Sequence, residues 1–163
     1  MPRILIIACG NPLRCDDGLA WRAADELEEK FSGGNVEILR THQLTPELAE
    51  TVSRSEALVF LDAASAGVGG QPGEVRCAQV GLPEGPVRFS HQLSPASLMA
   101  LARQLYGAPP RAFSVTLTGE CFEHGEALSP VVAAALSALV TRIETLIKEF
   151  LSPAAFPSDS GKP

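Results

Sequence analysis

Two acidic residues and one histidine stand where chemistry is expected in this sequence. Asp17 follows the first apolar segment, Asp62 closes the third, and His91 lies in the loop after a fourth. Two carboxylates and an imidazole form a hard-to-borderline ligand set that suits Ni, Zn, Fe or Mn, and three protein ligands leave coordination positions open. If the three side chains converge, they predict an open metal site.

Each of the three residues also has a purely structural interpretation. Asp17 stands where a helix N-cap belongs, which alone would stabilise the helix by about 1 kcal/mol. Asp62 could accept hydrogen bonds from backbone amides of the next turn, and His91 could be a solvated loop histidine. The position of all three at expected strand ends favours the metal site, because ligands gather at the carboxyl ends of parallel strands.

The elements that would position these residues are indicated by hydropathy and by Pro and Gly. Apolar or alternating runs predict strands at 3–9, 35–41, 57–62, 74–80 and 113–117, the fourth at an edge of the sheet. Helical periodicity and Thr-Pro or Ser-Pro starts predict helices at 20–31, 46–53, 94–106 and 129–150. Alternating strands and helices indicate an α/β fold, a three-layer α/β/α sandwich around a mostly parallel sheet.

Length and composition fit a single globular domain. The chain has 163 residues, of which 45% are hydrophobic and 20% charged; we expect one domain over 1–151 and a flexible C-terminal tail over 152–163. The net charge of −6 and the lack of a basic stripe disfavour nucleic acid as a partner. The apolar segment at 4–9 is too short for a signal peptide or a membrane span, so a cytoplasmic protein without a membrane partner is expected.

Several other chemistries find less support in the sequence. The four cysteines are scattered without a CxxC motif, which favours free thiols, and nothing pairs Cys15 with a histidine as a nucleophile would require. No G-x-S-x-G, P-loop or G-x-G-x-x-G motif occurs. Asp16 and Asp17 would form an aspartic-protease dyad only if they pointed the same way, which adjacent loop residues usually do not. A receiver domain of two-component signalling would need a lysine after the fifth strand, and the lysines are at positions 30, 148 and 162.

Five segments, in order along the chain, resemble the [NiFe]-hydrogenase maturation endopeptidases. GNPLRCDDG at 10–18 is similar to the family's Gly-Asn-x-Leu-x-x-Asp-Asp/Glu signature, and HQLTPELA at 42–49 resembles one branch of the family. LDA at 61–63 carries the second acidic residue, SHQLSP at 90–95 the histidine, and GECFEHGEALSP at 119–130 resembles the stretch before the family's last helix. The resemblance covers nearly the whole chain.

The resemblance implies a fold, an activity and a set of site residues. The fold would be a five-stranded sheet between helix layers, with the fourth strand antiparallel. The activity would be removal of the C-terminal extension from a [NiFe]-hydrogenase large-subunit precursor after nickel insertion. By position, the family's catalytic and metal-contacting residues fall on Asp17, Asp62 and His91, and the nickel they contact would be carried by the substrate. The protein would have no organic cofactor.

The sequence departs from the family pattern at two places, of which the second bears on the substrate. Ala20 stands where many members have glycine, which affects only helix packing. The segment His42-Gln43-Leu44-Thr45 replaces the Asp-Gly-Gly-Thr type of other branches, in a region thought to contribute to substrate choice. The sequence therefore leaves open which hydrogenase is processed, which group acts as the base, and whether the chain cuts its partner or serves as a chaperone for nickel-loaded large subunit.

Overall fold

A computed structural model of the chain describes residues 3–31, 33–67, 70–84 and 93–152. Its strands are β1 (Ile4–Cys9), β2 (Val36–Thr41), β3 (Ala57–Ala64), β4 (Val75–Gln79) and β5 (Arg111–Thr118). Its α-helices are α1 (Leu19–Phe31), α2 (Leu48–Ser53), α3 (Pro95–Tyr106) and α4 (Pro130–Leu151), and a short 3-10 helix, Cys15–Gly18, precedes α1.

The five strands form one mixed sheet in the order β2-β1-β3-β5-β4. Parallel pairing joins β2, β1, β3 and β5, and β4 pairs antiparallel with β5 at the edge. The expected α/β fold, the edge position of the fourth strand and its antiparallel direction are confirmed. Strand β1 lies between β2 and β3, so the chain passes from β1 to its neighbour on one side and then crosses over to its neighbour on the other side. This change of direction creates a crevice at the carboxyl ends of these strands.

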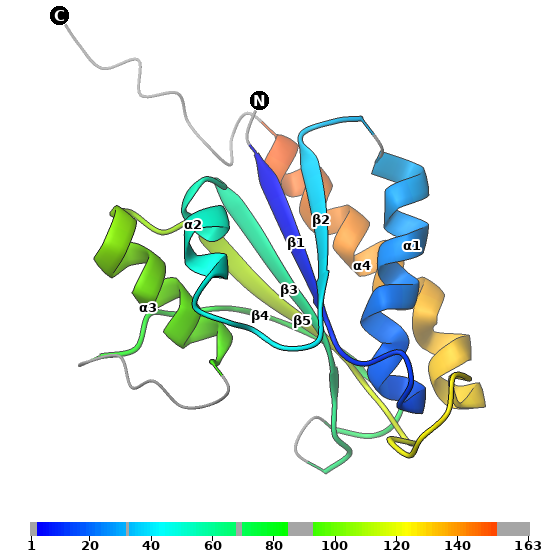
Figure 1. Ribbon diagram of the computed structural model, residues 1–163. Helices are drawn as coiled ribbons and strands as arrows, with labels where there is room; N and C mark the ends of the chain where they lie inside the picture. Colours follow the sequence, from blue (N-terminus) through cyan, green and yellow to red (C-terminus); the bar gives the residue numbers. More distant parts are fainter. Residues whose placement is uncertain (1–2, 32, 68–69, 85–92, 153–163) are drawn as a thin grey trace, which may run out of the picture.

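Helices cover both faces of the sheet. Figure 1 shows α1 and α4 side by side on one face and α2 and α3 on the other. Two apolar clusters fill the layers between helices and sheet, one centred on β1, β3, α1 and α4 and the other on β1, β3, α2 and α3. The side chains of β1 alternate between the clusters, so Ile6 joins the first and Ile7 the second. This explains why a continuous apolar run encodes β1.

The last helix is long and apolar enough to cross a membrane by length and composition alone. Its buried residues, however, lie along one side and pack into the core: Val132, Leu139, Val140, Ile143, Leu146, Ile147 and Phe150. Spacings of three, four and seven residues are typical of an amphipathic helix on a sheet. We therefore interpret α4 as a core helix.

Several element boundaries differ from the sequence prediction by one or two residues, and β5, for example, begins at Arg111 rather than at 113. The second helix begins at Leu48, two residues after the expected start at Pro46, and no side chain caps it. Instead the Leu48 N–H donates to the carbonyl of Thr45, so the Thr-Pro pair forms a turn that leads into the helix. Strand β3 continues to Ala64, beyond the expected end at Asp62, because β5 pairs with it in register as far as Thr118.

Two predictions fall on residues outside the described part of the chain. His91 belongs to the segment 85–92, and the expected tail, apart from Ser152, belongs to 153–163. The histidine ligand and the C-terminal tail therefore remain predictions.

Candidate functional site

A pocket of about 550 Å³ lies at the carboxyl ends of the parallel strands, where the switch in strand order predicts a crevice. It is lined by residues of five segments: Cys9, Gly10, Asn11, Arg14, Asp17, His42, Gln43, Leu44, Phe60, Leu61, Asp62, Leu93, Pro95, Ser114 and Thr116. Asp17 and Asp62, which lie 45 positions apart in the sequence, both line this pocket. The strand-end argument from the sequence thus brings together two of its three residues.

The loop after β1 holds Asp17 in place through its own backbone. The N–H of Asn11 donates to Oδ2 of Asp17 at 2.8 Å, and the Oδ1 of Asn11 accepts from the N–H of Leu13 at 2.9 Å. This second bond, from a side-chain oxygen to a backbone N–H two residues later, makes Asn11 a turn residue. The carboxylate of Asp17 is therefore fixed by the loop that precedes it rather than free to rotate in solvent.

Gly10 is required for the close approach within this loop. It has φ +147°, and a Cβ built on it would lie 2.0 Å from the carbonyl oxygen of Asp17. Only a residue without a side chain leaves room for the backbone of Asp17 at that distance.

Asp62 lines the pocket from β3. It lies in β3 after five buried residues and is itself half-buried. Burial raises the pKa of Asp62 to about 7, the N–H of Ala63 opposes the rise by donating to Oδ1 at 2.8 Å, and the charge of Asp17 adds to it. Asp62 therefore exchanges a proton near neutral pH, and a positive ion placed between the two acids would be attracted by both.

Asp16, the neighbour of Asp17, points into the protein instead of the pocket. Its side chain is fully buried and accepts four hydrogen bonds, from the N–H groups of Glu120 and Cys121 and from both the N–H and the hydroxyl of Ser129, at 2.7–2.9 Å. Burial would raise its pKa, but these bonds outweigh burial and lower it. Asp16 is therefore a structural anion, and the two adjacent carboxylates do not form a dyad.

His42 is a residue of the pocket that sequence reasoning did not select. It follows β2 at the carboxyl end, and its ring lies 5.4 Å from that of Trp21 in α1, tilted by 33°. Trp21 is held in turn by a hydrogen bond from Nε1 to the carbonyl of Thr41 at 3.3 Å. His42 could have been identified from its position, because it follows the second parallel strand as Asp17 follows the first.

Cys9 and Arg14 also line the pocket, one inside and one at its exposed side. Burial, with the charges of Asp62 and Asp17, raises the pKa of the Cys9 thiol to about 12, so this thiol stays protonated. Arg14 is oriented by a hydrogen bond from Nη2 to the carbonyl of Phe122 at 3.2 Å.

The predicted third ligand, His91, lies outside the described residues. Within the parts of the chain that the structure describes, no three His, Cys, Asp or Glu side chains are grouped closely enough to hold a metal ion. The three-residue metal site therefore remains a prediction, supported by the shared pocket of its two acids.

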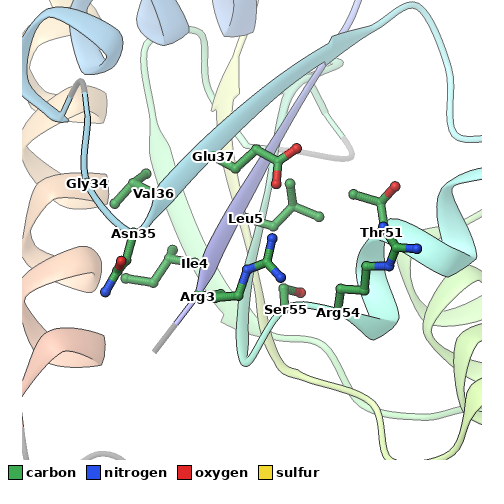
Figure 2. Close-up of a pocket in the computed structure, with 10 residues that line it drawn as sticks. All are labelled: Arg3, Ile4, Leu5, Gly34, Asn35, Val36, Glu37, Thr51, Arg54 and Ser55. Carbon is green, nitrogen blue, oxygen red and sulfur yellow. The ribbon is translucent and has the colours of Figure 1, made fainter. Parts of the chain in front are cut away.

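A second pocket, of about 330 Å³, lies at the opposite, amino-terminal edge of the sheet (Figure 2). It is bordered by Arg3 and Leu5 of the first segment, Glu37 of β2 and Arg54 after α2. Arg54 is paired with Glu50, and the hydroxyl of Ser55 donates to the carbonyl of Val52. Strand-end geometry favours the first pocket as the functional site.

Cys15 has an unusual backbone next to the site. It has φ 47°, and its N–H donates to the carbonyl of Gly125 at 2.7 Å. A hydrogen bond with the Cys121 thiol, then burial and nearby negative charges, raise the pKa of Cys15 to about 11. A protonated thiol of this kind is a poor nucleophile, which agrees with the sequence argument against Cys15 as a catalytic residue.

Comparison with solved structures finds this fold in proteins named hydrogenase maturation proteases. The hydrogenase maturating endopeptidase HybD from E. coli is 24% identical, with a TM-score of 0.73 over 90% of this chain and 93% of that chain. The [NiFe] hydrogenase maturation protease HycI from Thermococcus kodakarensis KOD1 is 21% identical, with a TM-score of 0.71 and the same two coverages. HybD from Thermococcus kodakarensis is 26% identical, with a TM-score of 0.65 over 88% of this chain and 98% of that chain.

Comparison of the sequence with protein-family models and with curated proteins gives no match. The structural matches confirm the fold that the motifs predict, and they bear out the resemblance to the hydrogenase maturation endopeptidases.

Proposed function

We propose that this protein is a hydrogenase maturation endopeptidase. It removes the C-terminal extension of a [NiFe]-hydrogenase large-subunit precursor after nickel insertion, in the cytoplasm. The observation that carries the proposal is the pair of acids, Asp17 and Asp62, in one pocket at the carboxyl ends of β1 and β3, in a fold shared with proteins named for this activity.

The nickel in this proposal belongs to the substrate. Asp17, Asp62 and His91 contact it at coordination positions that the precursor leaves free, so the presence of nickel becomes the specificity check. A precursor without nickel lacks these bonds, and discrimination rests on coordination chemistry rather than on the peptide sequence.

The charges in the pocket support this role. Asp62 has a pKa of about 7, raised by burial and by the charge of Asp17, and a divalent ion between the acids would remove their repulsion and favour the ionised forms. Asp17 is held by Asn11 before any ion arrives. The pocket thus presents acidic oxygens at a fixed position, which reduces the ordering required on binding.

Bond cleavage itself requires a base near the scissile carbonyl. Asp62 has a pKa of about 7 before nickel is bound, and contact with the nickel would favour its carboxylate form. Asp16 is excluded from this role by its burial and its four hydrogen bonds to residues 120–129. The base is therefore one of the residues that line the pocket.

The decisive experiment mixes the purified protein with large-subunit precursors, with and without nickel, and follows the mass of the precursor. We expect loss of a C-terminal peptide only from the nickel-loaded precursor. Asp17→Asn, Asp62→Asn and His91→Ala should each abolish this loss, whereas Glu29→Gln, an equivalent change on the exposed side of α1, should not.

Three outcomes would contradict the proposal in different ways. Cleavage by one of the three variants would remove that residue from the site. Equal cleavage of nickel-free precursor would contradict the nickel check. Nickel-dependent binding without mass loss would indicate a chaperone that cannot process its partner.

A further inference from the structure

We propose that Cys15 and Cys121 form a reversible disulfide bond that joins the loop carrying Asp17 (residues 10–18) to the loop before α4 (residues 119–129). The bond would regulate the candidate site, and this regulatory part rests on the proposed function. Formation of the bond itself does not depend on the proposed function.

The two loops are already held together around these cysteines. The N–H of Cys15 donates to the carbonyl of Gly125 at 2.7 Å, and the N–H of the next residue, Asp16, donates to the carbonyl of Cys121 at 2.9 Å. The side chains of Cys15 and Cys121 are hydrogen-bonded to each other. These contacts place the two thiols beside each other on adjacent segments, which is the arrangement that a disulfide requires.

The residue next to the Cys15 sulfur is a glycine, Gly125. A Cβ added to Gly125 would lie 3.1 Å from Sγ of Cys15, so a larger residue there would press against this sulfur. Both thiols are half-buried, which leaves them accessible to a small reagent. Cys15 also has a backbone conformation, φ 47°, that glycine adopts at lower cost, yet the chain has a thiol at this position.

The other two cysteines have different surroundings. Cys9 lines the pocket beside the acids, and Cys77 lies in β4 and packs against the cluster of α1 and α4. Cys77 therefore provides a matched control for the pair.

The oxidant in this proposal is a low-molecular-weight disulfide such as oxidised glutathione. Cys121 reacts first, because the raised pKa of Cys15 makes that thiol the poorer nucleophile: the Cys121 thiolate attacks a sulfur of the small disulfide and expels a glutathione thiolate, which gives a mixed disulfide. The second protein thiol loses its proton and attacks the protein sulfur of that mixed disulfide, which expels the second glutathione thiolate. Two protein thiols and one small disulfide become one protein disulfide and two small thiols.

Bond formation has a consequence for the candidate site. An S–S bond is about 2.05 Å long, so two hydrogen-bonded sulfur atoms must approach each other and draw their loops together. Cys15 is two residues from Asp17, and displacement of a substrate-binding group by about 1 Å can reduce a rate strongly. The oxidised protein should therefore process its precursor more slowly.

The test uses the full chain, oxidised with glutathione disulfide, alkylated and digested with trypsin. We expect the peptides 15–22 and 112–142 to be joined. Before alkylation, the mass of the intact protein should be lower by about 2 Da, because two hydrogens leave. Dithiothreitol should separate them. Cys77→Ser should form the same link, whereas Cys15→Ser and Cys121→Ser should not.

In the processing assay, oxidation should slow the wild-type protein and the Cys77→Ser variant by about tenfold or more, and leave the Cys15→Ser and Cys121→Ser variants unchanged. Glutathione adducts without the link, or a link through another cysteine, would overturn the disulfide. A complete link with an unchanged rate would overturn the regulation. If the reduced protein processes no precursor, the proposed function fails, and the peptide map still decides whether the disulfide forms.

Discussion

Asp16 and Asp17 are neighbours in the chain and have opposite surroundings. Asp17 lines the pocket, whereas Asp16 is buried against the loop 119–129. The backbone of the short 3-10 helix turns the two side chains away from each other, which separates a functional acid from a structural one.

We expect Asp16→Asn to destabilise the protein by about 2–4 kcal/mol, because an amide would turn its NH₂ toward donors that now face a carboxylate oxygen. The pKa of Asp16 is lowered in the folded protein. Its stabilising effect is therefore present above the ordinary pKa of an aspartate and lost as the pH falls through the lowered value. Urea unfolding of wild-type and variant protein at pH 7 and at low pH measures this, and an equal stability at pH 7 would contradict it.

Asp62 should have the opposite pH dependence. Its pKa rises from 3.8 to about 7 on folding, so the folded state binds a proton more readily than the unfolded state and stability falls as the pH rises from about 4 to 7. Asp62→Asn removes this effect. We expect the variant to be more stable than the wild type at pH 8, by up to about 4 kcal/mol, and the gap to close near pH 4.

Urea unfolding at several pH values measures this difference, and Glu29→Gln serves as the control. A gap that does not change with pH would show that burial does not raise the pKa of Asp62.

His42 should matter for processing more than for stability. Its side chain is exposed, lines the pocket and lies against Trp21. We expect His42→Ala to lower the processing rate by about tenfold, as loss of a positioning or proton-transfer group would, with a change in unfolding free energy below about 1 kcal/mol. His124→Ala, at an exposed histidine that does not line the pocket, should leave the rate unchanged.

At the scale of elements, the loop after β1 is the part of the site with the least tolerance for change. Gly10→Ala would place a methyl group against the carbonyl of Asp17 at a positive φ. We expect lower stability, by about 1–3 kcal/mol, and lower processing at a temperature where the variant is folded. Gly33→Ala, also at a positive φ but with open space around its Cβ, is the matched control for the backbone strain.

The elements themselves could be predicted from local patterns. The apolar run of β1 and the Ser-Pro start of α3 identify these elements, and Ser94 accepts a hydrogen bond from the N–H of Ser97 as such a start requires. The same signal before α4 has a different use. The hydroxyl of Ser129 donates to Asp16 instead of capping the helix, and a partner 113 positions away leaves no local trace in the sequence.

At the scale of the molecule, the fold and the meeting of Asp17 and Asp62 could be predicted, because parallel strands bring their carboxyl ends to one edge of the sheet. The role of Asp16 could not, since it depends on contacts between the start and the last third of the chain. The place of His42 in the pocket depends in the same way on the neighbour relation of β1 and β2.

The sheet order also determines when the site can exist during protein synthesis. Strand β5 fills the place beside β3, and the partners of Asp16 lie at positions 120–129. A ribosome that has made only the first hundred residues has therefore made both acids of the pocket, but neither β5 nor the partners of Asp16. We expect the nascent chain to lack a formed site until the start of α4 has emerged, so a precursor bound by an incomplete protease should not be cut.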